Sequence, residues 1–212
     1  MTRILLVRHG QSAWNASGRW QGWADPPLTE LGRQQAWSAA AAVGTVDAIV
    51  ASDLQRAIAT AMVLSEVIGV GPVVVEPGLK ERDVGAWTGC TRAEITERWP
   101  EAFAEFLAGG PDGSGSTPAT PPGGEPVSTV LDRVTAALGR VADLVGPTGE
   151  AVAVTHGGVI RALERSLGQE PAPVANLGAL WVGVRDGGRL VLGERVLLVD
   201  PGDVAVTVPR QL

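Results

Sequence analysis

Short runs of hydrophobic residues alternate along the chain with longer segments that mix hydrophobic and polar residues. Continuous runs of this kind are typical of strands that are buried on both faces, as in a parallel sheet. They occupy residues 4–7, 47–51, 73–75 and 151–155. The mixed segments place their hydrophobic residues at helical spacing and predict helices over residues 29–43, 53–68, 127–145 and 159–167. Strands that alternate with helices predict an α/β layered fold with a mostly parallel sheet. We expect Ser52 or Asp53 to be the N-cap of the second helix.

Two further regions depart from this alternation. Residues 109–126 are rich in Gly, Pro and Ser, a composition that favours a flexible surface loop. Because strands and helices resume after this insert, we do not treat it as a linker between domains and expect a single domain over residues 1–212. Residues 178–199 predict a β-hairpin with its turn at residues 186–188. This hairpin either pairs with a second copy in a homodimer or closes the edge of the sheet.

Composition excludes several classes of protein. The net charge of −6 argues against a nucleic-acid binder that depends on a basic surface. A single cysteine, Cys90, excludes an internal disulfide and a paired-cysteine metal or redox site. The one lysine, Lys80, is followed by Glu81, so the chain has no GxxxxGK[ST] phosphate loop. No hydrophobic run is long enough to span a membrane or to form a signal peptide, and we expect a cytoplasmic protein with no membrane partner.

Charged and titratable residues follow the predicted strands. Arg8 and His9 come after the first strand, Arg56 lies in the first turn of the helix after the second, Glu81 follows the third, and His156 ends the strand at residues 151–155. The carboxyl ends of parallel strands meet at one edge of a sheet, where α/β proteins bind their ligands. We therefore expect these side chains to converge on one site.

These residue types suit phosphoryl transfer. Arginine binds phosphate oxygens in a bidentate manner and keeps its charge at any working pH. A neutral imidazole is a nucleophile toward phosphorus, and nearby arginines should lower its pKa. A carboxylic acid can protonate the leaving oxygen, and backbone N–H groups of the helix after Gly157 can bind the anion. The residues therefore predict a phosphohistidine mechanism that needs no metal and no other cofactor.

The same residues lie in a series of short motifs. Together they resemble the histidine phosphatase superfamily, the phosphoglycerate mutase-like clan, over residues 3–168. The resemblance implies a three-layer αβα sandwich with a mostly parallel central sheet. The motifs are Leu5-Leu6-Val7-Arg8-His9-Gly10-Gln11-Ser12, Gly18-Arg19-Trp20-Gln21-Gly22-Trp23, Leu28-Thr29-Glu30-Leu31-Gly32, Ser52-Asp53-Leu54-Gln55-Arg56-Ala57, Leu79–Gly89 and Thr155-His156-Gly157-Gly158.

The resemblance also implies roles for individual residues. His9 would be the nucleophile that becomes phosphorylated, and Glu81 would protonate the leaving group and then activate water. Some relatives carry an acidic Asp directly after the second histidine, where this chain has Gly157, so Glu81 must supply the acid. Further phosphate contacts are expected from the residues Arg8, Arg56, His156, Asn15, Gln21, Gly22 and Gly157. Arg82 is expected to pair with a carboxylate rather than to bind substrate.

Three functions remain open, each acting on a small phosphorylated metabolite. The first is a metal-independent phosphatase. The second is a cofactor-dependent phosphoglycerate mutase, which the segment 18–32 resembles. Mutases carry paired arginines that grip a second phosphate, whereas the equivalent region here has Arg92 and Arg98 followed by an arginine-free loop. This difference favours hydrolysis. The third is a non-catalytic protein that binds phosphorylated ligands, which would need neither His9 nor Glu81.

Overall fold

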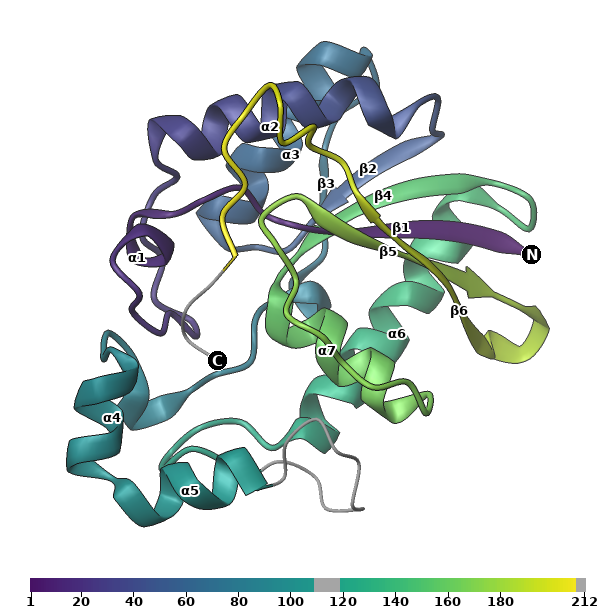
Figure 1. Ribbon diagram of the computed structural model, residues 1–212. Helices are drawn as coiled ribbons and strands as arrows, with labels where there is room; N and C mark the ends of the chain where they lie inside the picture. The colour runs from purple at the N-terminus through teal and green to yellow at the C-terminus, as the bar shows by residue number, and fades with distance from the viewer. Residues whose placement is uncertain (109–118, 209–212) are drawn as a thin grey trace.

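A single six-stranded sheet organises the computed structural model, which describes residues 1–108 and 119–208 (Figure 1). The strand order is β3-β2-β4-β1-β5-β6. The first four strands in this order are parallel to one another, and β5 and β6 are antiparallel additions at one edge. The strands are β1 (Thr2–Arg8), β2 (Ala48–Ala51), β3 (Val74–Val75), β4 (Glu150–Thr155), β5 (Gly178–Val184) and β6 (Leu190–Leu197). The mostly parallel sheet predicted from the sequence is confirmed.

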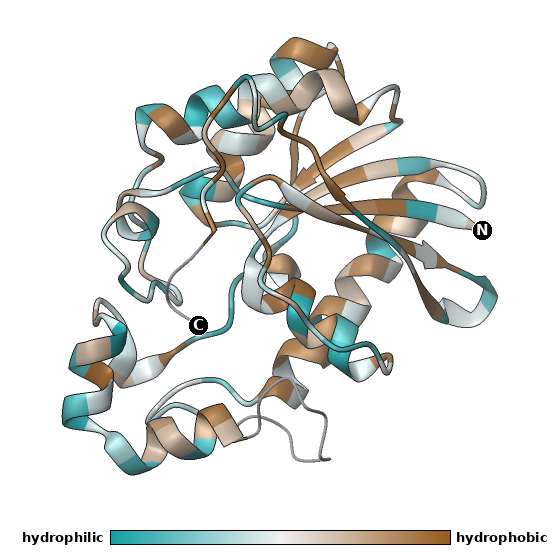
Figure 2. Cartoon of the chain, in the orientation of Figure 1, coloured by the Kyte–Doolittle hydropathy of each residue, from teal (hydrophilic) through white to brown (hydrophobic). Residues whose placement is uncertain are grey.

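The central strand β1 is buried on both of its faces. Ile4 and Leu6 pack into one hydrophobic cluster, with residues of α6 (Val127–Val145) and α7 (Gly157–Ser166). Leu5 and Val7 pack into a second cluster, with residues of α2 (Glu30–Val43) and α3 (Gln55–Ile68). Helices therefore cover both faces of the sheet, which confirms the αβα arrangement, and Figure 2 shows the hydrophobic strands between them. Burial on both sides explains why these strands read as continuous hydrophobic runs.

The four predicted helices are present, with one correction at a helix terminus. Thr29 is the N-cap of α2, and its side chain accepts a hydrogen bond from the backbone N–H of Gly32. The N-cap of α3 is Leu54, so the prediction of Ser52 or Asp53 is wrong. Ser52 Oγ instead accepts a hydrogen bond from Leu54 N and lies 2.8 Å from His156 Nε2. The serine therefore belongs to the site described below rather than to the helix terminus.

Three helices were not predicted from the hydrophobic pattern. They are α1 (Ala13–Ala16), α4 (Arg92–Arg98) and α5 (Pro100–Ala108). The last two pack on a third hydrophobic cluster that is built largely from aromatic side chains, among them Trp20, Trp87 and Phe103. A readable signal preceded α4, because Thr91 and Glu94 form a capping box at its start.

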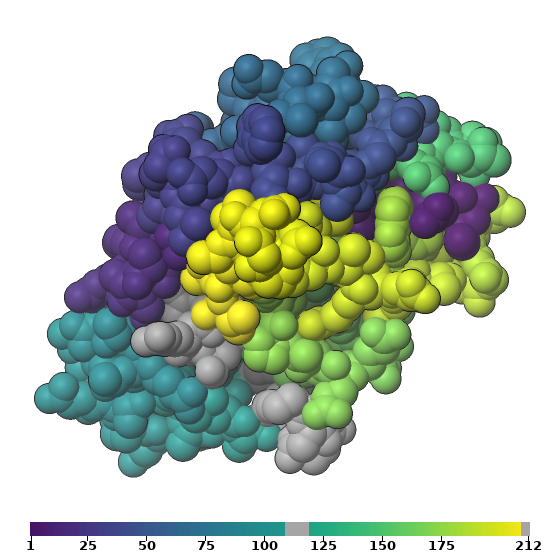
Figure 3. Space-filling model, turned by 45° about the horizontal axis from the view of Figure 1, so that its top comes forward, coloured from purple at the N-terminus to yellow at the C-terminus, as the bar shows by residue number. Residues whose placement is uncertain are grey.

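The insert and the C-terminal hairpin complete the fold. Of the predicted loop at 109–126, residues 119–126 contain no helix or strand, and residues 109–118 lie outside the described part of the chain. The predicted hairpin is confirmed as β5 and β6, joined through the turn Asp186–Gly188. After β6 the C-terminal segment lies over residues of the N-terminal part of the chain, as the yellow and dark blue surfaces in Figure 3 show. There Gln35 of α2 donates a hydrogen bond to the carbonyl of Ala205. Among the described residues, no helix combines the length and hydropathy needed to cross a membrane.

Two leucines on α6 test the assignment of the core. Leu138 is 0% exposed and Leu144 is 53% exposed. We expect Leu138→Ala to lower the free energy of unfolding by about 2–5 kcal/mol, because it leaves a cavity in the core. The matched control Leu144→Ala should change it by less than about 0.5 kcal/mol. Urea denaturation of both variants measures the difference, and equal losses would contradict the packing described for α6.

Candidate active site

The predicted site residues come together at the carboxyl edge of the parallel strands. The rings of His9 and His156 lie 5.2 Å apart, centroid to centroid. A cavity of about 330 Å³ opens beside them. Its lining includes six of the predicted residues, namely Arg8, His9, Gln21, Gly22, Glu81 and Gly157. The other three, Asn15, Arg56 and His156, are buried and do not line this cavity.

His9 is held as a neutral imidazole with one nitrogen unprotonated. Its Nδ1 lies 2.7 Å from the carbonyl oxygen of Gly10, and a carbonyl only accepts, so Nδ1 carries the proton. The Nε2 lone pair is therefore available. Burial lowers the pKa of His9 well below its ordinary value, and the positive charges of Arg56 and Arg8 lower it further. The lowered pKa expected from the sequence is confirmed in direction, with burial as the main cause.

Arg8 and Arg56 are buried and held mainly by backbone carbonyl groups. Arg8 Nη1 donates to Val174 O at 2.6 Å. Arg56 Nη1 donates to Ala24 O at 2.6 Å, and its Nη2 donates to Gly22 O at 2.9 Å. Burial lowers the pKa of Arg8 to about 9 and that of Arg56 to about 10, so both remain cations at neutral pH. The Nε atom of each guanidinium is buried without a hydrogen-bond partner among the described residues.

Two more buried nitrogens of the site have no partner in the described part of the chain. They are Asn15 Nδ2 and His156 Nδ1. Asn15 Oδ1 is occupied, because it accepts from Ser12 N at 3.2 Å and from Asn176 Nδ2 at 3.3 Å. Buried polar groups are nearly always hydrogen-bonded in folded proteins. Four unpartnered nitrogens from four chain segments around one histidine therefore indicate a site for an anion with several oxygen atoms.

Glu81 is fixed by two backbone N–H groups. Its Oε1 accepts from Arg82 N at 2.8 Å and its Oε2 accepts from Gly158 N at 3.1 Å. This approach requires glycine at position 158, because a Cβ there would lie 2.3 Å from Glu81 Oε1. At Gly157 the nearest atoms to an added Cβ belong to Arg8, at an ordinary 3.4 Å.

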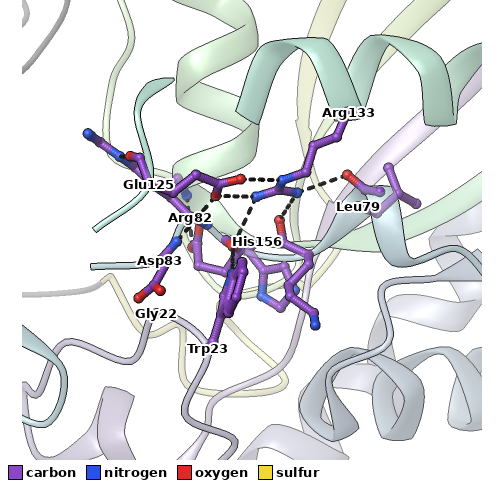
Figure 4. Close-up of polar contacts among 12 residues, drawn as sticks. Gly22, Trp23, Leu79, Arg82, Asp83, Glu125, Arg133 and His156 are labelled. Atoms are coloured by element: carbon purple, nitrogen blue, oxygen red, sulfur yellow. Dashed lines mark hydrogen bonds and ion pairs between the residues drawn. The ribbon is translucent and has the colours of Figure 1, made fainter. Parts of the chain in front are cut away.

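Arg133 on α6 positions the backbone that carries Glu81, and sequence reasoning missed it. Its guanidinium donates to the carbonyl groups of Gly78, Lys80 and Glu81, at 2.9, 2.5 and 3.1 Å. It also binds Glu125 through two hydrogen bonds of 2.8 Å (Figure 4). Trp23 Nε1 donates to the same Glu81 carbonyl at 2.7 Å. The backbone at Glu81 is thus held by side chains from two other segments.

Three arginines line the cavity that were not predicted as site residues: Arg82, Arg161 and Arg165. Arg82 was expected to pair with a carboxylate, but its Nε donates to the backbone carbonyl of Glu125 at 2.7 Å. Arg161 and Arg165 stand four residues apart on a predicted helix, and this spacing was a signal that they share one face. No group of three or more His, Cys, Asp or Glu side chains suited to a metal ion occurs among the described residues.

Comparison with known proteins gives consistent matches over most of the chain. The profile of the histidine phosphatase superfamily (branch 1) matches residues 4–180. A protein named metal-independent phosphoserine phosphatase from Arabidopsis thaliana is 39% identical over 167 residues, covering 77% of this chain and 67% of the relative. A glucosyl-3-phosphoglycerate phosphatase from Mycobacterium tuberculosis is 38% identical over 190 residues, covering 84% of this chain and 79% of the relative.

A solved structure agrees with these sequence matches. The structure of mycobacterial glucosyl-3-phosphoglycerate phosphatase in complex with VO3 superimposes with a TM-score of 0.77 and 31% identity. The superposition covers 91% of this chain and 97% of that one.

The buried histidines predict a stability that falls in mild acid. The pKa values of folded His9 and His156 lie well below 6.5, whereas an unfolded histidine titrates near 6.5. Below about pH 6.5 the unfolded chain therefore binds protons that the folded chain does not, and the free energy of unfolding decreases. Each histidine contributes a slope approaching about 1.4 kcal/mol per pH unit.

Urea denaturation between pH 5 and 8 measures this slope. In the variant His9→Asn, which lacks one of the two groups, the slope between pH 6.5 and 5 should be smaller by up to about 1.4 kcal/mol per pH unit. An unchanged slope would show that His9 is not held neutral in the folded protein.

Proposed function

The chain belongs to the histidine phosphatase superfamily, and its similarity to named phosphatases assigns it to the phosphatases of that family. On this premise we propose that it hydrolyses a small phosphomonoester without a metal ion, through a phosphohistidine formed on His9. One observation carries the proposal. Four buried nitrogens without partners among the described residues surround a neutral histidine whose Nε2 is unprotonated, and Glu81 lines the cavity that this histidine also lines.

The first half of the reaction transfers the phosphoryl group to His9. The Nε2 lone pair attacks phosphorus, the ester P–O bond breaks, and the proton of the Glu81 carboxylic acid goes to the leaving oxygen. Arg8 and Arg56 donate to the phosphoryl oxygens and stabilise the charge that builds on them. Asn15 Nδ2 and His156 Nδ1 add two neutral donors. Ser52 supports this role of His156, because a hydroxyl that donates to Nε2 keeps the ring proton on Nδ1.

The second half hydrolyses the phosphohistidine. Glu81 is now a carboxylate and takes a proton from water as the water oxygen attacks phosphorus. The N–P bond breaks, inorganic phosphate is released, and His9 returns to its neutral form. The backbone N–H groups of Arg82 and Gly158 orient the carboxylate for both steps. Gln21 and Gly22 line the entrance to the phosphate site, and Gly157 brings its backbone N–H to the start of α7.

Two alternatives predict different behaviour. A non-catalytic phosphate-binding protein would use the arginines alone and would have no need of an unprotonated His9 beside Glu81. A phosphoglycerate mutase needs a second cationic site, which the sequence lacks in the region equivalent to the paired arginines of mutases. Arg92 and Arg98 indeed do not line the cavity, but Arg161 and Arg165 do, from a different element. The mutase alternative predicts isomerisation of 3-phosphoglycerate when bisphosphoglycerate is added, and hydrolysis alone excludes it.

Replacement of the nucleophile tests the proposal directly. We expect His9→Ala to lower kcat/KM for phosphate esters by more than about 1000-fold, because the covalent step is lost. Wild-type protein quenched during turnover should carry an acid-labile, base-stable phosphate on the peptide that contains His9, detected by mass spectrometry. Hydrolysis that persists in His9→Ala would overturn the proposal.

Replacement of Glu81 tests the proposed general acid. Glu81→Gln should lower activity about 100- to 10,000-fold, whereas replacement of the exposed Glu66 by Gln should leave activity unchanged.

The glycine beside Glu81 gives a second test. The Cβ of Gly158→Ala would collide with Glu81 Oε1, so we expect the carboxyl group to shift and kcat to fall about 10- to 100-fold. The matched variant Gly157→Ala adds the same methyl group at ordinary contact distance and should lose much less. Steady-state kinetics, with urea denaturation to compare stability, separates the two. Equal losses in kcat would mean that the position of Glu81 does not control the reaction.

A further inference from the structure

Arg161 and Arg165 form a cationic pair on the α7 side of the cavity. They are one helical turn apart and both line the cavity that also exposes His9 and Glu81. The acidic neighbour Glu164 does not neutralise them at close range. Its carboxylate forms an ion pair with Arg195 of β6, although its charge still raises the pKa of Arg161 to a small extent.

Neither arginine of the pair has an ion-pair partner among the described residues. Within residues 1–108 and 119–208, Arg161 donates from Nε to Gly157 O at 3.2 Å, and Arg165 Nε is buried without a hydrogen-bond partner. Burial lowers the pKa of both groups, that of Arg161 to about 10. For Arg161 the negative charge of Glu81 offsets part of this shift, and the positive charge of Arg165 adds to it. Cations held in this way are stabilised by a bound anion.

The phosphate site does not account for this pair. Its oxygens already have Arg8, Arg56, Asn15 and His156 as donors. Glu81 is the carboxylate found among the described residues that line the cavity, and its oxygens are taken by backbone N–H groups. The pair is therefore available to a second group on the bound molecule, beyond the ester oxygen.

The remaining wall of the cavity is hydrophobic. It is formed by Phe106 and Leu107 of α5, Val127 and Val130 of α6, two prolines of the loop before β5, and Val84 of the segment after Glu81. Such a wall offers few partners for the hydroxyl groups of a neutral sugar, but it suits the carbon chain of a leaving group.

We propose that Arg161 and Arg165 bind an anionic group on the leaving group of the substrate, separated from the phosphate ester by an apolar segment. The inference rests on the proposed phosphatase activity and specifies its substrate class. The anion is a carboxylate or a second phosphate, because a guanidinium pair recognises both.

Matched synthetic esters test the inference. The probes are phosphate monoesters of ω-hydroxy acids with two to five methylene groups, and the corresponding ω-carboxamides and ω-phosphonates. The remote substituent leaves the reactivity of the ester nearly unchanged, so differences in kcat/KM report recognition of the distal group. We expect at least one acid to exceed its neutral amide by about 10- to 100-fold in kcat/KM. The substituent that gives the higher kcat/KM, carboxylate or phosphonate, identifies the anion.

Variants then connect this preference to the pair. Arg165→Gln should reduce the ratio of anionic to amide substrate about 10-fold, and Arg165→Lys should restore part of it. Arg33→Gln, on the exposed face of α2, should leave the ratio as in wild type. Equal kcat/KM for acids and amides in wild type, or a ratio that Arg165→Gln does not change, would overturn the inference.

A binding measurement keeps this test independent of turnover. Calorimetry with the His9→Ala protein should show tighter binding of the anionic ester than of its amide, and weaker discrimination when Arg165→Gln is added. Discrimination without any hydrolysis in wild type would support the second site and refute the phosphatase. Hydrolysis in wild type without discrimination between the anionic ester and its amide would support the phosphatase and refute the second site.

Discussion

The burial of two guanidinium groups at the end of the parallel strands is the constraint on which the site depends. A buried cation is costly unless its donors are satisfied. Here backbone carbonyls satisfy most of them, from Val174 for Arg8 and from Gly22 and Ala24 for Arg56. Carbonyls bind the two cations without neutralising their charge, and Arg56 also pairs with Asp25 at 3.5 Å. The residual charge lowers the pKa of His9, and the remaining donors stay available for an anion.

Hydrogen bonds to backbone carbonyls also explain how the loop that carries Glu81 can take part in the site as a rigid element. Glu81 lies in a segment without helix or strand, between two short 3-10 helices. Its position is set by Arg133, which joins three backbone carbonyls to Glu125, and by the indole of Trp23. A general acid on an unsupported loop would sample many positions, whereas these contacts restrict it to one. The contacts that set the proposed catalytic geometry therefore extend into α6, far along the chain from His9.

Much of the fold and of the candidate site could be predicted from the sequence, and the features that were missed were missed for physical reasons. The strands were predictable because burial on both faces leaves a continuous hydrophobic run, as in β1. Arg8, His9, Glu81 and His156 could be grouped because parallel strands end at one edge. Helices α4 and α5 were missed because their core is completed by Trp20 and Trp87, which are distant in sequence. Arg133 and Ser52 were missed because only tertiary contacts distinguish them from ordinary surface arginine and helix-capping serine.

The aromatic cluster under α4 and α5 has a consequence for how such a protein can change over time. It shares no residue with the two clusters that pack against the sheet, yet Trp20, Val84 and Phe106 reach the cavity wall. One part of the cavity wall therefore belongs to a hydrophobic unit separate from those that pack the strands, while Val130 and Val174 of the wall belong to the cluster on one face of the sheet. Substitutions in the smaller unit can reshape the wall while the strands that carry His9 and His156 keep their packing. The shape of this part of the wall can therefore change without repacking the residues around β1 and β4.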